Sequence, residues 1–215
     1  MAEQNQPTLF PELQQPPPSR VLAGGLVVRE VLCKSVLNRF CSNEYTSDYS
    51  FNCYRGCTHN CVYCYARFMQ WFHPHVEPWG KFVDVKINAP EVLAREVRRL
   101  PPGLVFACSA CDGWQPLEAQ YRLTRRCCQI LLQAGFRLRV LTKSRLIMQD
   151  LELFVGRDVR VSVTITTADE RIARLWEPRA ASVAERVRVL QQAKAAGLHT
   201  TVMFCPLLPG FSDTE

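Results

Sequence analysis

The stretch Cys57-Thr58-His59-Asn60-Cys61-Val62-Tyr63-Cys64 sets three cysteines at C-x3-C-x2-C spacing, directly after a short apolar segment. A 4Fe-4S cluster takes four ligands, so three thiolates would hold three irons and leave the fourth iron open to a small molecule. A zinc site, completed by Cys53 or His59, is the alternative. Zinc sites usually combine two separated ligand pairs, and no convincing second pair follows here, so the spacing favours the cluster.

The composition limits the class of protein. A chain of 215 residues, 47% of them hydrophobic, can form the core of one domain. Eleven cysteines without an N-terminal apolar signal segment predict reduced thiols and a cytoplasmic location. No apolar run approaches the length of a membrane span, so no membrane partner is expected. The net charge of +6 permits a nucleic acid partner, but Arg-rich helix faces of soluble enzymes give the same balance.

The two ends of the chain differ from its middle. The first twenty residues are polar and proline-rich, and we expect residues 1–29 to form a mobile leader before a core domain over residues 30–215. The final residues, Ser212-Asp213-Thr214-Glu215, resemble a capping box that begins a helix. We therefore expect the core domain to be incomplete at its C-terminal end.

Between these ends, short β-branched runs alternate with helical patterns, which is typical of an α/β fold. Strands are predicted over residues 50–54, 82–87, 104–108, 137–143, 158–166 and 198–205. Helices are predicted over residues 66–72, over 88–100 with Asn88 as the cap, over 123–134, after a cap at Ser144, and from the capping box of Ser182 and Glu185 to Gly197.

The strand at 158–166 has two unlike faces. Val159, Val161 and Val163 alternate with Arg160, Ser162 and Thr164. A parallel strand covered on both sides is normally apolar on both faces. The hydroxyl face is therefore expected to line a polar lumen in an open or partial barrel; an ordinary half-exposed strand is the alternative. In such barrels the loops after the strands hold the ligand, and the cysteine loop follows the first strand.

Residues 54–67, Tyr-Arg-Gly-Cys-Thr-His-Asn-Cys-Val-Tyr-Cys-Tyr-Ala-Arg, resemble the bacterial radical S-adenosylmethionine (SAM) proteins related to spore photoproduct lyase. Further similarity lies at residues 34–39, 115–118, 123–126, 141–144, 177–179 and 206–210, and the resemblance extends from about residue 30 to the end. It implies an α/β fold, a partial (β/α)6 barrel. We expect this chain to end before the last βα unit of that barrel.

The same resemblance implies a 4Fe-4S cluster on Cys57, Cys61 and Cys64, with SAM on the open iron and Tyr63 near its adenine. One electron would then cleave SAM to a 5'-deoxyadenosyl radical. The expected SAM-pocket residues are Ser109, Thr142, Ser162, Thr164, Arg179 as the carboxylate partner, Leu208 and Gly210. Each of these also has an ordinary structural interpretation, as a turn residue, a surface ion pair or a core residue.

Spore photoproduct lyase returns a hydrogen atom to its substrate from a cysteine, so the resemblance makes Cys111 and Cys108 candidate hydrogen donors. It implies a nucleic acid base or lesion as substrate and a reducing protein such as flavodoxin or ferredoxin as partner. A non-catalytic zinc or nucleic-acid-binding module with a structural cysteine site is the alternative function. The sequence leaves the reaction and the oligomeric state open.

Overall fold

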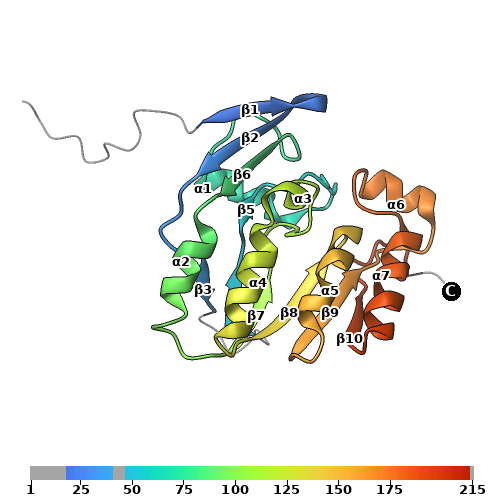
Figure 1. The fold of residues 1–215 in the computed structure, drawn as a ribbon. Helices are drawn as coiled ribbons and strands as arrows, with labels where there is room; N and C mark the ends of the chain where they lie inside the picture. The colour runs from blue at the N-terminus through green and yellow to red at the C-terminus, as the bar shows by residue number, and fades with distance from the viewer. Residues whose placement is uncertain (1–17, 41–46, 214–215) are drawn as a thin grey trace, which may run out of the picture.

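The computed structural model describes residues 18–40 and 47–213. They form a larger sheet of six strands and a smaller sheet of four, with helices lying along the larger sheet (Figure 1). The larger sheet has the order β10-β9-β8-β7-β4-β3. Its strands are β3 (Leu37–Arg39), β4 (Tyr49–Phe51), β7 (Leu104–Ala107), β8 (Arg137–Thr142), β9 (Val159–Thr164) and β10 (His199–Met203).

Five of these strands, β4 and β7 to β10, pair in parallel, and β3 lies antiparallel at one edge. Parallel neighbours need crossover connections, which helices supply. The helices are α1 (Met69–Phe72), α2 (Ala89–Glu96), α3 (Glu118–Tyr121), α4 (Leu123–Gln133), α5 (Leu151–Phe154), α6 (Glu170–Trp176) and α7 (Val183–Ala195). This arrangement confirms the predicted α/β fold and partial barrel.

The main core lies between the larger sheet and α4 and α7, which cover one of its faces (Figure 1). Strand β9 shows how the two faces differ. Register pairs Val161 with Val140 and Val163 with Thr142, and the valines belong to the core. Ser162 pairs with Leu141 and therefore lies on the opposite face, as the alternation predicts. Ser162 and Thr164 are also buried, so the C-terminal half of β9 is covered on both faces.

The smaller sheet has the order β1-β2-β6-β5. Its strands are β1 (Ser19–Leu22), β2 (Leu26–Val31), β6 (Phe82–Lys86) and β5 (Tyr54–Arg55). The predicted leader boundary at residue 29 is therefore wrong, because residues 19–29 pair into this sheet. Apolar residues such as the buried Val28 give β2 a core contact that outweighs the weak local pattern. Residues 1–17 of the predicted leader lie outside the described residues.

Three local predictions also need correction. The single strand at 50–54 is two short strands, β4 and β5, which belong to different sheets. Residues 66–72 begin as a 3-10 helix, η3 (Tyr65–Phe68), before α1. Asn88 precedes α2 without capping it, because its side chain instead accepts from Cys33 N–H at 2.8 Å and donates to Cys33 O at 3.0 Å.

Two predicted caps are confirmed. Ser182 and Glu185 form the reciprocal hydrogen bonds of a capping box at the start of α7. Ser144 accepts from Leu146 N–H and begins the 3-10 helix η4 (Arg145–Asp150), not an α-helix directly. Another 3-10 turn, η2 (Ala23–Gly25), joins β1 to β2. No helix in the described part of the chain is long and apolar enough to cross a membrane.

Candidate active site at the cysteine loop

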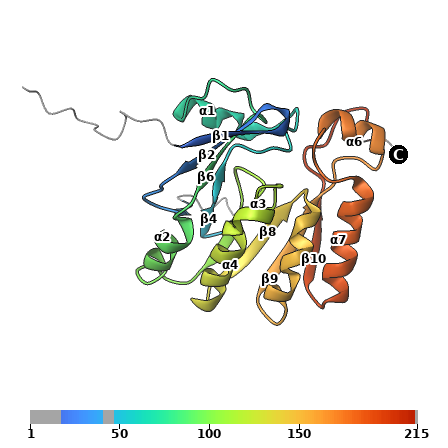
Figure 2. The ribbon, with the colours of Figure 1, turned by 45° about the horizontal axis from the view of Figure 1, so that its top comes forward.

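The cysteine loop, residues 57–64, follows β5, where the chain has passed from the larger sheet into the smaller sheet. The helices α3 and α6, which follow β7 and β9, lie at one end of the larger sheet, the end near the smaller sheet (Figures 1 and 2). Cys57 and Cys61 are buried and Cys64 is partly exposed, and all three are free thiols. Burial raises the pKa of Cys61 to about 11 and also raises the pKa values of Cys57 and Cys64.

Gly56 starts the loop in a conformation that disfavours other residues. Its φ is +86°, and a Cβ atom at this position would overlap the backbone carbonyl oxygen of Phe82 in β6. Glycine is therefore required on both conformational and steric grounds. The close packing fixes the first cysteine of the loop against the smaller sheet.

The segment after β7 holds the first half of the loop. Gln115, fully buried, accepts from Thr58 N–H at 3.0 Å and donates to Gly56 O at 3.3 Å. Asp112 accepts from the Thr142 hydroxyl at 2.8 Å, and one of its carboxylate oxygens lies 3.4 Å from His59 Nδ1. Burial lowers the pKa of His59, although Asp112 acts in the opposite direction. Sequence reasoning assigned no role to Gln115 or Asp112.

Asn52 connects the same segment to the end of β4. Its side chain donates to Ser109 Oγ at 3.1 Å and accepts from Ala110 N–H at 2.8 Å. The Cys111 thiol also points to Asn52 Oδ1, at 3.5 Å. Tyr65, which follows the last cysteine, donates its hydroxyl to Ser109 O. Ser109 and Cys111, two predicted site residues, therefore lie together beside the cysteine loop.

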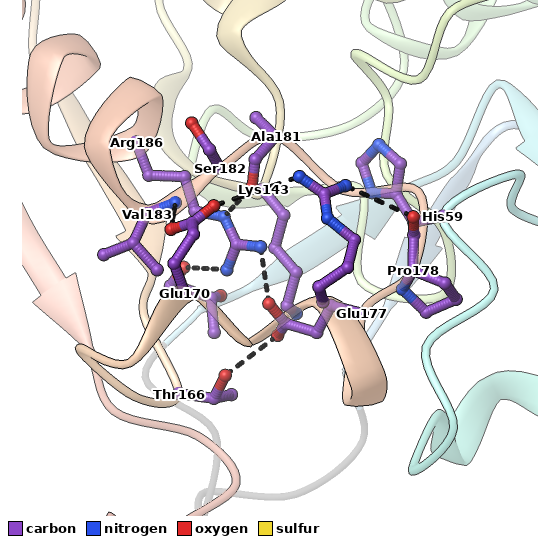
Figure 3. Close-up of polar contacts among 12 residues, drawn as sticks. His59, Lys143, Thr166, Glu170, Glu177, Pro178, Ala181, Ser182, Val183 and Arg186 are labelled. Atoms are coloured by element: carbon purple, nitrogen blue, oxygen red, sulfur yellow. Dashed lines mark hydrogen bonds and ion pairs between the residues drawn. The ribbon is translucent and has the colours of Figure 1, made fainter. Parts of the chain in front are cut away.

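The segment after α6 holds the second half of the loop. Glu177 accepts from the Tyr63 hydroxyl. It also accepts from the Thr166 hydroxyl at 3.2 Å (Figure 3). Lys143 Nζ lies 5.6 Å from the centroid of the Tyr63 ring. The ring therefore has a cation near its face and a carboxylate at its hydroxyl. Glu177 was noted in the sequence only as part of a family match, since a lone acidic residue after a helix carries no local signal.

The remaining predicted SAM-pocket residues are spread more widely. Thr142 lies on the opposite face of the sheet from Ser162 and donates to Asp112. Arg179 donates to Gly80 O at 3.0 Å, which ties it to the loop before β6. Leu208 and Gly210 lie in the turn after β10, and Leu208 is buried. The structure thus groups Tyr63 and Ser109 at the cysteine loop and connects Thr142 to it through Asp112.

Both residues proposed as the fourth ligand of a zinc ion, Cys53 and His59, contact other side chains. Cys53 Sγ lies 3.5 Å from Cys127 Sγ, and His59 Nδ1 faces Asp112. In the described residues, no three His, Cys, Asp or Glu side chains are grouped so that they could hold one metal ion. A mononuclear zinc needs its donors to converge on one point, whereas each cysteine of a 4Fe-4S cluster binds a different iron.

The residues present fit a cluster with a small-molecule ligand. Three free thiols on one loop supply the ligand set that leaves one iron open. Ser162 Oγ is buried on the face opposite the helices and has no hydrogen-bond partner among the described residues. A buried hydroxyl without a partner is a group that a bound ligand can satisfy.

The fold defines the class of an α/β partial barrel, in which three free cysteines lie on the loop after β5. The family model of the radical SAM superfamily matches residues 51–215. The chain therefore belongs to the radical SAM superfamily. Membership implies a 4Fe-4S cluster and SAM as cofactors.

Curated relatives extend the similarity. An uncharacterized protein of Mycobacterium bovis is 34% identical over 203 residues, covering 88% of this chain and 58% of its own length. An uncharacterized protein of Methanocaldococcus jannaschii is 30% identical over 169 residues, covering 78% of this chain and 63% of its own length. The chain thus spans about 60% of the length of these relatives.

Solved structures of spore photoproduct lyase share the fold. The complex with dinucleoside spore photoproduct has a TM-score of 0.67 at 17% identity, covering 85% of this chain and 52% of that chain. A doubly substituted mutant of the lyase, with bound AdoMet and the same dinucleoside, has a TM-score of 0.66 at 16% identity, with coverage of 83% and 51%. At this level of identity the likeness concerns the fold alone.

Proposed function

We propose that this chain is the cofactor-binding core of a radical SAM enzyme. Cys57, Cys61 and Cys64 would hold the 4Fe-4S cluster, and the observation that carries the proposal is their position as three free thiols on one loop, directly after β4 of the larger sheet and β5 of the smaller sheet. When bound, the cluster supplies the electron that cleaves SAM to methionine and a 5'-deoxyadenosyl radical, which abstracts a hydrogen atom from the substrate. The chain's own residues then hold the loop, orient the cofactor and exclude water.

Tyr63 and Ser162 are the residues best suited to contact SAM. The Tyr63 ring is fixed through its hydroxyl, so one ring face is presented in a constant orientation. Ser162 offers the unpartnered hydroxyl. Ser109, Thr164, Arg179, Leu208 and Gly210 remain proposed pocket residues, and Thr142 supports the pocket through Asp112. An external reducing protein, such as a flavodoxin or ferredoxin, would supply the electron. All cysteines in the described residues are free, which supports a cytoplasmic location.

We further propose a nucleic acid base or lesion as substrate, supported by the fold shared with spore photoproduct lyase. Cys111 is the better candidate hydrogen donor of the two cysteines after β7. Its thiol faces Asn52 next to the cysteine loop, whereas Cys108 packs tightly under Gly113. Replacing Cys111 with alanine should change the fate of the substrate radical, and replacing Cys108 should not.

Electron paramagnetic resonance (EPR) of the anaerobically reconstituted, dithionite-reduced chain tests the cofactor assignment. A reduced-cluster signal that changes shape on adding SAM is expected, and it should be lost in Cys64→Ser. Cys205→Ser is the matched control, because Cys205 is an exposed free thiol outside the loop. Zinc in place of iron in the unmodified chain would contradict the proposal.

The substrate class has a separate test. The reduced chain is incubated with SAM and dinucleoside spore photoproduct, and the release of thymidine products is measured beside 5'-deoxyadenosine. Repair of the dinucleoside supports a lesion as substrate. If 5'-deoxyadenosine forms at the same rate with and without the dinucleoside, and no repair occurs, the cofactor assignment stays intact and the assignment of a lesion as substrate is overturned.

A further inference from the structure

Glu177 and Arg186 form an ion pair that is closed off from solvent. Arg186 Nη2 lies 2.5 Å from Glu177 Oε2, and the two side chains are 0% (Glu177) and 1% (Arg186) exposed. Arg186 also donates to Ala181 O at 2.8 Å and to Thr164 O at 3.1 Å (Figure 3). Removing two charges from water is costly, so a buried ion pair is weak evidence for stability. Stability alone therefore does not account for a buried pair at this position.

The pair reaches the cysteine loop through Tyr63. This residue lies between the second and third cysteines, and its hydroxyl donates to Glu177 Oε1, the oxygen that does not face Arg186. Two backbone hydrogen bonds run beside this contact, from Val62 N to Trp176 O at 2.8 Å and from Arg179 N to His59 O at 3.3 Å. Residues 176–179 thus form a strap along residues 59–63.

Hydrogen bonds connect this strap to the end of β9. Arg186 is part of α7 and binds the carbonyl oxygen of Thr164, the last residue of β9. Glu177 also accepts from Thr166, two residues beyond the end of β9. The position of the Tyr63 hydroxyl is therefore tied to the end of β9, where the proposed pocket residues Ser162 and Thr164 lie.

We propose that Glu177, held by Arg186, is a positioning residue that fixes Tyr63 and the second half of the cysteine loop relative to the end of β9. The inference rests on the proposed function for its purpose, because the loop is the proposed seat of the cluster. The contacts that fix Tyr63 involve only residues of this chain, so their effect can be tested on the metal-free protein.

Two variants separate positioning from simple stabilisation. Tyr63→Phe removes the hydroxyl and leaves the ion pair intact. The double variant Glu177→Leu with Arg186→Met replaces the buried pair by apolar side chains, which proteins often tolerate better than one unpaired charge. Tyr121→Phe is the matched control, since the Tyr121 hydroxyl donates to Glu30, away from the cysteine loop.

The first readout is the alkylation rate of each cysteine in the reduced, metal-free chain, followed with iodoacetamide and peptide mass spectrometry. Cys64 is partly exposed, and the exposed Cys205 serves as internal reference. The rate ratio of Cys64 to Cys205 should rise about tenfold in both variants, as expected when a hydrogen bond to a charged group is lost. It should stay unchanged in Tyr121→Phe.

An unchanged ratio in both variants would overturn the proposal, and a lowered melting temperature beside it would leave the pair a stabilising element only. If the double variant fails to fold, Tyr63→Phe alone decides. In the reconstituted chain, a second readout is the EPR change on adding SAM, which should weaken in Tyr63→Phe at equal iron content. If the unmodified chain binds no cluster, the proposed function fails while the alkylation test still stands.

Discussion

Gln115 binds the backbone on both sides of Cys57, accepting from Thr58 N–H at 3.0 Å and donating to Gly56 O at 3.3 Å. The second half of the loop is held from another segment, where Glu177 accepts a hydrogen bond from the Tyr63 hydroxyl. Each half therefore depends on a buried side chain from a different βα connection. Support of this kind holds ligands in place before a cofactor binds.

Gln115→Ala should destabilise the chain by about 2 kcal/mol or more, because Thr58 N–H and Gly56 O lose their buried partner. Gln115→Met is the matched variant, since it keeps most of the volume and removes both hydrogen bonds. Urea unfolding of the metal-free proteins gives the stability, and iron retained per chain after reconstitution gives the effect on the loop. Equal stability and iron retention in the Met variant would argue against the assigned role.

Gly113 lies so close to Cys108 that a methyl group at residue 113 would overlap Cys108 Sγ. Gly113→Ala should therefore cost about 1–3 kcal/mol through overpacking. The double variant with Cys108→Ala removes the overlapping sulfur and should recover part of this loss. A double-mutant cycle by thermal unfolding measures the coupling. Strictly additive effects of the two substitutions would mean that the contact is relieved in another way.

The parallel sheet, its main helices and the cysteine loop were predictable because their signals are local. Alternation of apolar residues gave the core face of β9, and the pattern of Ser182 and Glu185 gave the start of α7. The supports of the loop were not predictable in this way. Gln115 is 57 residues from Thr58, and Glu177 is 114 residues from Tyr63, so no periodicity connects them.

The smaller sheet was missed for a related reason. Strand β2 gains its stability by parallel pairing with β6, which lies more than fifty residues further along the chain. Proline-rich sequence before residue 19 also concealed the start of β1. Thr142 shows the same limit within the site, because its position at the end of β8 gave no indication that its hydroxyl donates to Asp112, thirty residues earlier in the chain.

Ser182 caps α7 by accepting from Glu185 N–H at 3.2 Å, while Glu185 accepts from Ser182 N–H at 2.9 Å. Ser182→Ala should destabilise the chain by about 1 kcal/mol. Ser182→Asp, which can accept the same hydrogen bond, should recover most of the loss. Thermal unfolding compares the variants. A full loss in the Asp variant as well would show that the capping hydrogen bond is not the source of the effect.

Glu118 gives the fold a pH dependence. It is buried, accepts from the Tyr54 hydroxyl and, at 3.0 Å, from Arg125 N–H, and burial raises its pKa from 4.5 to about 7. The folded chain then binds a proton that the unfolded chain has released, so this contribution is fully present below pH 4.5 and is lost as pH rises through 7. The loss amounts to roughly 3 kcal/mol.

Glu118→Gln cannot titrate, and its amide can serve both partners. The variant should therefore gain stability over the unmodified chain between pH 5 and pH 8 in urea unfolding, and parallel pH profiles of the two proteins would refute the assignment.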